Sequence, residues 1–169
     1  MSKAATRRLT LPGAMLARGF WLYVWRIETP KGEMLYVGRT GDSSSPHASP
    51  PFTRMTQHLG KQKNSNALRR NLLTAGIEAE DCKSFDLIAH GPIFDEVPSD
   101  GTREERMEKH KPLRDIVAEM DKQLADDLTK AGYNVLNVMH SKKPLDVVLW
   151  KDVRTAFAKH FERLGRSDG

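Results

Sequence analysis

Residues 20–38, FWLYVWRIETPKGEMLYVG, predict a β-hairpin around which the rest of the chain would be arranged. Their first part is rich in aromatic and β-branched residues, as strands are, and the TPKG that follows supplies turn residues. Tyr23 and Tyr36 would then lie on neighbouring strands, where their hydroxyl groups could converge on one face. Two strand tyrosines are more often simple packing residues, so the pair alone does not indicate a function.

The chain after the hairpin predicts loops, two short helices and one more strand. Residues 40–51 contain four serines and three prolines and predict a loop. Two short helices follow, the first capped by Thr53 and the second by Ser65. Residues 84–90 predict the third strand.

The second half of the sequence is mainly helical. A long helix is predicted from about residue 102 to residue 131, and Pro112 would either split it or begin a second piece. Residues 133–138 predict an extended piece, and a last helix would run from about 146 to 164. The predicted fold class is α+β, a small three-stranded antiparallel sheet flanked by helices with a C-terminal helical extension.

Length and composition favour one ordinary domain. The 169 residues are 38% hydrophobic and 29% charged, which is apolar enough for a core. We expect a basic lead-in over residues 1–18, the main domain over 19–140, and a C-terminal helix over 141–169 that packs on the domain or extends it. The net charge of +5 permits a polyanionic partner without requiring one.

Other classes of protein are disfavoured. A single cysteine, Cys82, excludes an internal disulfide and a multi-cysteine zinc site. The sequence shows neither the apolar segment of a signal peptide nor a run long enough to span a bilayer. We therefore expect a soluble cytoplasmic protein without a membrane partner, located at the nucleoid if it binds DNA.

Polar residues after the hairpin are ordinary one by one. Arg54 and His58 are four residues apart and would share one face of a short helix, but most such pairs are simply solvated. Further positively charged residues follow nearby, and such residues commonly do no more than form a solvent-exposed face. They are Lys61, Lys63, Arg69 and Arg70.

Taken in order, these residues resemble the signatures of the GIY-YIG nuclease family. Leu22 and Tyr23 match the end of its first signature, and residues 36–38, YVG, match the second with valine in place of isoleucine. Arg54 and His58 have the Arg-x3-His spacing of the restriction-enzyme branch. Farther on, the YNVLN segment resembles the asparagine segment of the family.

The resemblance covers roughly residues 20–138 and depends on the order of the motifs, because none is specific alone. The first signature departs from the family at Trp21, which stands in the place of a glycine. We regard that position as structural, so the departure counts lightly.

The resemblance implies a metal-dependent endonuclease acting on duplex or branched DNA. Tyr23 would be the first choice as base, with His58 relaying or orienting its proton, and Tyr36 the second choice or a phosphate donor. Arg54 would clamp the scissile phosphate, and Gly38 would let the backbone approach it. Arg39 would hold an adjacent phosphate, and Asn134 would brace the tyrosine or the phosphate from the rear of the site. Sequence-independent contacts to the DNA backbone would come from Lys61, Lys63, Arg69 and Arg70.

The implied metal ion is Mg²⁺ or Mn²⁺ on one carboxylate, and the sequence leaves Asp121 and Glu119 as alternatives. In the family, apolar residues follow the catalytic glutamate at three and four positions. Apolar residues occupy those places after Asp121, whereas polar residues occupy them after Glu119. Asp121 also lies closer to the apolar stripe of the predicted helix, which favours it as the metal ligand. It is, however, an aspartate, whereas the family uses a glutamate.

Two other interpretations compete with a nuclease. The chain could be a catalytically degenerate nucleic-acid-binding protein on the same fold, or a scaffold in which the tyrosines only pack. The four residues Tyr23, Tyr36, Arg54 and His58 together favour the nuclease. A small one-site nuclease that cuts both strands would act twice or form a homodimer. The apolar face of the last helix is available for a dimer but is more typical of packing on the domain's own core.

Overall fold

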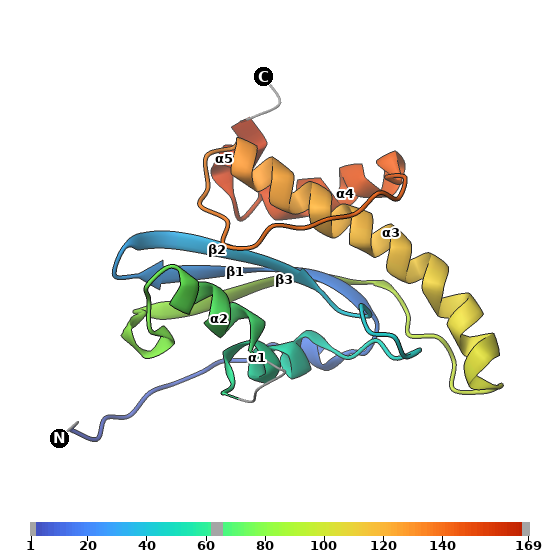
Figure 1. Cartoon of the computed structure of the whole chain (residues 1–169), viewed down its shortest axis with the longest axis horizontal. Helices are drawn as coiled ribbons and strands as arrows, with labels where there is room; N and C mark the ends of the chain where they lie inside the picture. The colour runs from blue at the N-terminus through green and yellow to red at the C-terminus, as the bar shows by residue number, and fades with distance from the viewer. Residues whose placement is uncertain (1–2, 62–65, 167–169) are drawn as a thin grey trace.

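The computed structural model describes residues 3–61 and 66–166, and it places one antiparallel sheet between two layers of helices (Figure 1). The central strand β1 (Phe20–Thr29) pairs with β2 (Gly32–Arg39) on one side and β3 (Ser84–Phe94) on the other. This confirms the predicted α+β class with a three-stranded antiparallel sheet and a helical C-terminal part.

The helices divide between the two faces of the sheet. One face is covered by the later helices, α3 (Arg103–Lys130), α4 (Val147–Ala158) and α5 (Glu162–Arg166). The other face is covered by the earlier ones, α1 (Pro51–Leu59) and α2 (Ala67–Thr74). Two 3₁₀ turns, η1 (Gly13–Leu16) and η2 (Ala79–Asp81), complete the regular structure of the described residues.

The register of the hairpin decides which side chains share a face. Tyr23 is paired with Gly38, and Trp25 is paired with Tyr36. Because directly paired residues point to the same side of a sheet, both tyrosines face α1 and α2, as the sequence predicted.

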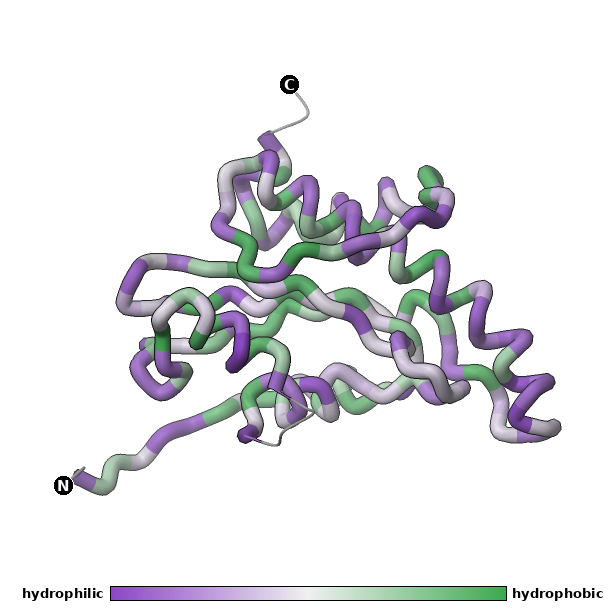
Figure 2. Tube along the Cα trace, in the orientation of Figure 1, coloured by the Kyte–Doolittle hydropathy of each residue, from purple (hydrophilic) through white to green (hydrophobic). Residues whose placement is uncertain are grey.

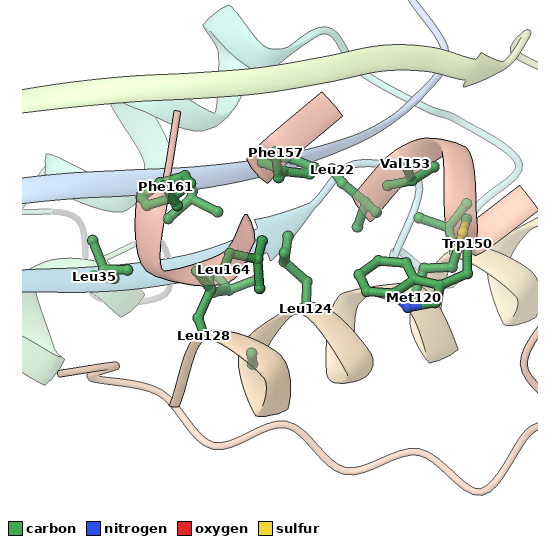
Figure 3. Close-up of a cluster of buried hydrophobic side chains, with 14 of the residues drawn as sticks. Leu22, Leu35, Met120, Leu124, Leu128, Trp150, Val153, Phe157, Phe161 and Leu164 are labelled. Carbon is green, nitrogen blue, oxygen red and sulfur yellow. The ribbon is translucent and has the colours of Figure 1, made fainter. Parts of the chain in front are cut away.

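The larger core lies on the opposite face. Leu22 of β1 and Leu35 of β2 pack there against Leu124 of α3 and against the aromatic residues Phe157 and Phe161 of the C-terminal part (Figure 3). All five side chains are buried. The apolar face of the C-terminal helices is therefore covered by the chain's own sheet, and it does not provide a free surface for a dimer.

Helix α3 begins at a capping box in which Thr102 and Glu105 bond to each other's backbone N–H, and it continues without a break through Pro112. Glu108, whose carbonyl loses its partner at the proline, is exposed like Pro112 itself, so water can serve that carbonyl. The first half of α3 is largely hydrophilic and extends past the sheet (Figure 2). Within the described ranges, no helix combines the length and the apolar composition needed to cross a membrane.

Other boundaries also differ from the prediction. α1 begins at Pro51 instead of after Thr53, because a proline fits the first turn, where no intrahelical N–H bond is needed. The predicted last helix is divided into α4 and α5, and β3 extends four residues beyond the predicted end at residue 90. Ser65, the predicted cap of the second helix, lies outside the described residues.

Residues 134–137 close the outer edge of β2. The N–H of Leu35 donates to the Asn134 carbonyl at 2.8 Å, and the N–H of Leu136 donates to the Leu35 carbonyl at 2.7 Å. The Asn137 side chain continues this pairing: its Oδ1 accepts from the Val37 N–H at 3.0 Å, and its Nδ2 donates to the Val37 carbonyl at 2.6 Å. Asn137 thus fixes the strand immediately before Gly38.

We expect Asn137→Ala to lower the free energy of unfolding by about 2 kcal/mol, because it removes both partners of the buried Val37 backbone. Asn134→Ala is the matched control, since the Asn134 side chain is exposed and only its backbone pairs with β2. Its effect should stay within about 0.5 kcal/mol. Urea unfolding followed by circular dichroism measures both, and equal losses would contradict the role assigned to Asn137.

Candidate active site

Tyr23, Tyr36 and His58 meet on the face of the sheet covered by α1. The Tyr23 hydroxyl and His58 Nε2 are 2.5 Å apart. The centroid of the His58 ring lies 5.7 Å from that of Tyr23 and 5.1 Å from that of Tyr36, so the imidazole packs against both phenol rings. Three residues predicted as one site are therefore brought together from β1, β2 and α1.

Gly38 provides the space for this arrangement. A Cβ atom at position 38 would lie 2.5 Å from the Tyr23 hydroxyl oxygen, closer than real contacts allow. The glycine of the YVG motif therefore accommodates the Tyr23 ring. The expectation that it lets the backbone approach a phosphate stays a prediction.

The Tyr23–His58 pair is neutral near pH 7. Burial, assisted by the positive charge of Arg54, lowers the pKa of His58 to about 4. Burial raises the pKa of Tyr23 well above its ordinary value and the pKa of Tyr36 to about 12. Two tautomers of a neutral imidazole fit this contact: Nε2 accepts from the Tyr23 O–H when the ring proton is on Nδ1, and Nε2 donates to the Tyr23 oxygen when it carries the proton itself. In the first tautomer His58 can receive the Tyr23 proton.

Arg54 lies one helical turn before His58 on α1. Its guanidinium pairs with Asp42 and donates from Nη1 to Gln57 Oε1 at 3.2 Å. The Arg54 charge lowers the pKa of both site tyrosines, against the larger effect of burial. Neither Asp42 nor Gln57 was predicted as a site residue, and the loop and helix patterns contain no signal that identifies them.

Asp121 lies on α3, which covers the face of the sheet opposite to the two tyrosines. Its side chain is fully buried, and its Oδ2 lies 2.6 Å from Nη1 of Arg39, the last residue of β2. Burial raises the pKa of Asp121 to about 6, and the Arg39 charge opposes that rise. The Asp121 charge also raises the pKa of both tyrosines, so the carboxylate is within electrostatic reach of them. The expectation that Asp121 faces the sheet is confirmed.

Glu119 is buried as well but is not joined to the site. Within residues 3–61 and 66–166, no hydrogen bond or ion pair links Glu119 to Arg39, Arg54 or His58. Two residues along a helix correspond to roughly 200°, so Glu119 and Asp121 point in nearly opposite directions. Of the two carboxylates, Asp121 is the one that pairs with Arg39 and whose charge raises the pKa of the tyrosines.

The described residues offer a metal ion few protein ligands. Nowhere in the described ranges do three His, Cys, Asp or Glu side chains converge as a metal cluster. Asp121 Oδ1 and Glu119 Oε2 are each buried without a hydrogen-bond partner among the described residues, so each carboxylate has one unpaired oxygen. Mg²⁺ commonly takes one or two carboxylates and completes its shell with water and substrate phosphate. At Asp121, Arg39 on Oδ2 would compete with a cation for the carboxylate.

The other predicted DNA contacts are spread over a wider surface. Arg69 is paired with Glu80, as is Lys61, so neither charge is free in this structure. Arg70 is exposed, and its charge lowers the pKa of Tyr36, which places it near the site. Lys63 lies outside the described residues.

The asparagine segment and Trp21 have roles in holding β1 and β2. The side chain of Asn134 is exposed, so its predicted bracing role is not seen, and Asn137 is the asparagine that contacts β2. The YNVLN pattern contains both asparagines and gave no reason to prefer the second. Trp21 lies at an irregularity of the β1–β3 pairing, donates from Nε1 to the Ala17 carbonyl at 3.0 Å, and packs on Gly91. Its position is structural, as expected.

Comparison of the chain with protein-family models, with curated proteins and with solved structures finds no match. The side chains around Tyr23 are therefore the observations from which a function is inferred.

The low pKa of His58 predicts a pH-dependent stability. Between its unfolded value near 6.5 and its folded value near 4, the unfolded chain binds the proton first, so falling pH favours unfolding. We expect the free energy of unfolding of the wild type to fall more steeply than that of His58→Gln between pH 7 and pH 4. The difference should be on the order of 2–3 kcal/mol.

Denaturant unfolding at several pH values measures this difference. Asp121, whose pKa is raised, has the opposite dependence between about pH 4 and pH 6, but both proteins share it, so the comparison isolates His58. Parallel pH profiles would show that the His58 imidazole is not buried as described.

Proposed function

We propose that this chain is a metal-dependent endonuclease that hydrolyses DNA phosphodiester bonds with a site of the GIY-YIG kind. The observation that carries the proposal is the hydrogen bond between Tyr23 and a neutral His58, with Arg54 and Asp121 in electrostatic reach of the same hydroxyl. These residues come from three separate elements, β1, α1 and α3. A domain in which the tyrosines only packed would not require a histidine acceptor, a cation and a carboxylate around one phenol.

In the proposed reaction, Tyr23 takes a proton from the attacking water while His58 takes the hydroxyl proton of Tyr23. A free phenolate would be costly here, because burial raises the pKa of Tyr23. The concerted relay avoids it. The water oxygen forms a bond to phosphorus, the bond from phosphorus to the leaving oxygen breaks, and that oxygen takes a proton from solvent. Tyr36, the second choice as base, would donate to a phosphate oxygen.

The cations of the site would stabilise the negative charge that develops on the phosphate oxygens in the transition state. Arg54 would exchange Asp42, whose side chain is 38% exposed, for the non-bridging oxygens of the scissile phosphate. Arg39 would hold a neighbouring phosphate after leaving Asp121. Asp121 would hold Mg²⁺ or Mn²⁺, which supplies a Lewis acid that offsets negative charge in the transition state.

The second candidate function is nucleic-acid binding without catalysis. The observation in its favour is the Arg39–Asp121 ion pair, which neutralises the carboxylate proposed to hold the metal. A protein that had lost turnover could keep this pair permanently, together with its positive surface.

Nicking of supercoiled plasmid with Mg²⁺ or Mn²⁺ tests the proposal. We expect Arg54→Ala to lower the rate by at least about 100-fold, because it removes the charge that stabilises the transition state. Arg166→Ala is the matched control, since Arg166 is paired only with Glu162 on α5 and should keep the wild-type rate. Asp121→Asn should be inactive, and Glu119→Gln should stay active.

Two results would contradict parts of this proposal. An inactive Glu119→Gln beside an active Asp121→Asn would move the metal to Glu119. Salt-sensitive DNA binding by a wild type that shows no cleavage with either metal would favour the binding protein.

The ion pair predicts that Arg39 limits metal binding in the absence of DNA. We expect Arg39→Ala to bind Mn²⁺ about tenfold more tightly than the wild type, because a guanidinium no longer occupies Asp121 Oδ2. Arg39→Lys, which keeps the charge, is the control. Calorimetric titration at pH 8 keeps Asp121 ionised, since its pKa rises when Arg39 is removed. Unchanged or weaker Mn²⁺ binding would show that Arg39 does not compete for this carboxylate.

A further inference from the structure

A polar cavity of about 490 Å³ opens beside Arg54. Its wall is formed by the loop between β2 and α1, by Arg18 before β1, and by Arg54 and Gln57 of α1. The loop side chains that line it are Ser43, Ser45, Ser49 and His47. The volume falls within the range of roughly 300–1,000 Å³ that is usual for small-molecule sites. None of the roles derived above uses this cavity.

The loop that forms the cavity is held from several sides. Thr40, fully buried, donates from Oγ1 to the Gly19 carbonyl at 2.6 Å and accepts from the Trp21 N–H at 2.9 Å. At the other end, the N–H of Ala48 donates to Glu96 at 2.6 Å, and the Ala48 carbonyl accepts from the Gly19 N–H at 2.9 Å.

Helix α3 holds the middle of the same loop. His110 Nε2 lies 2.9 Å from the Gly41 carbonyl. Arg103 and Arg106 donate to the carbonyls of Ser44 and Pro46, both at 3.4 Å. A loop fixed at so many points presents its side chains in a preformed arrangement, which lowers the entropic cost of binding.

The charges around the cavity argue against a phosphate as its occupant. Arg18 forms two hydrogen bonds with Glu96, at 2.8 and 2.7 Å, and Arg54 is paired with Asp42. Each arginine that lines the cavity therefore has a carboxylate partner, and an anion would have to displace it. Arg54 is assigned to the scissile phosphate, which leaves the rest of the cavity without a cation of its own.

The remaining groups both donate and accept hydrogen bonds. Serine hydroxyls, an imidazole and the Gln57 amide can satisfy the mixed donor and acceptor pattern of a nucleobase edge. Ser43 and Ser45 contact each other, with their Oγ atoms 3.0 Å apart, so the positions of both hydroxyl oxygens are fixed within the loop. A neutral, preformed and hydrogen-bonding cavity is the chemistry of base recognition.

We infer that this cavity binds a nucleobase adjacent to the scissile phosphate and sets the base preference of cleavage. The inference rests on the proposed nuclease function, because Arg54 lines the cavity and also serves the phosphate. Because Arg54 is shared by the cavity and the scissile phosphate, the base in the cavity must belong to a nucleotide next to the cut. Gln57, which holds the Arg54 guanidinium through Oε1, would connect base recognition to the position of the catalytic arginine.

The test uses a pool of duplexes randomised around the cut and sequencing of the products. We expect the wild type to prefer one base at a position next to the cut. Gln57→Ala and Ser45→Ala should reduce that preference by at least about fivefold, with other positions unchanged. Thr56→Ala on the exposed side of the same helix is the matched control and should cleave with the wild-type preference.

The outcomes separate this inference from the proposed function. If the wild type cleaves all sequences equally, or if the cavity variants keep the wild-type preference, the inference is overturned while the nuclease stands. Variants that lose rate equally on every sequence would indicate a backbone contact and would also overturn it. If the wild type does not cleave, selection of bound duplexes from the same pool gives the preference directly. A wild type that neither cleaves nor binds the pool overturns both.

Discussion

The hydrogen bond between Tyr23 and His58 is the interaction on which the site depends, and it exists because position 38 has no side chain. Strand pairing places Tyr23 directly opposite Gly38, and the phenol lies in the space that a Cβ there would fill. From this place the hydroxyl reaches the last turn of α1, so one contact connects the central strand to the helix that also carries Arg54. The geometry of the hairpin and the position of α1 are therefore coupled through a single buried phenol.

The cations of the site are neutralised within the chain itself. Arg39 is paired with the buried Asp121, and Arg54 with the partly exposed Asp42. Burying an arginine or a carboxylate alone is costly, so these pairs satisfy the folded protein before any partner is bound. The phosphates of a DNA backbone are negatively charged like the Asp121 and Asp42 carboxylates, so they offer both arginines an alternative partner. Release of Asp121 from Arg39 at that moment would make a buried carboxylate available only when DNA is present, which links metal binding to the substrate.

Patterns within the sequence predicted the helices and strands and most of the residues of the candidate site. They did not predict which of those residues form ion pairs or hydrogen bonds with one another. The hairpin, the third strand and the stripe of α3 follow from local periodicity, and the order of the motifs brought Tyr23, Tyr36, Arg54 and His58 forward as one set. The pairing of Arg39 with Asp121 joins residues 82 positions apart, and no local pattern reports such a contact. The side-chain contacts of Asn137 with β2 escaped prediction for the same reason, because only the edge of β2 distinguishes two asparagines in one extended segment. The continuity of α3 through Pro112 depends on solvent access to one carbonyl, which composition does not reveal.

That continuity has a consequence for how the two parts of the site are held. Before Pro112, α3 fixes the loop of the polar cavity through Arg103, Arg106 and His110; after it, the same helix presents Asp121 to Arg39. A rise of 1.5 Å per residue sets the separation between these two groups of contacts, so one rigid helix defines the spacing from the cavity to the carboxylate. Loops alone would leave that spacing variable. The proposed nuclease would need a fixed distance between the base it reads and the bond it cuts, and the unbroken α3 helix would provide that distance.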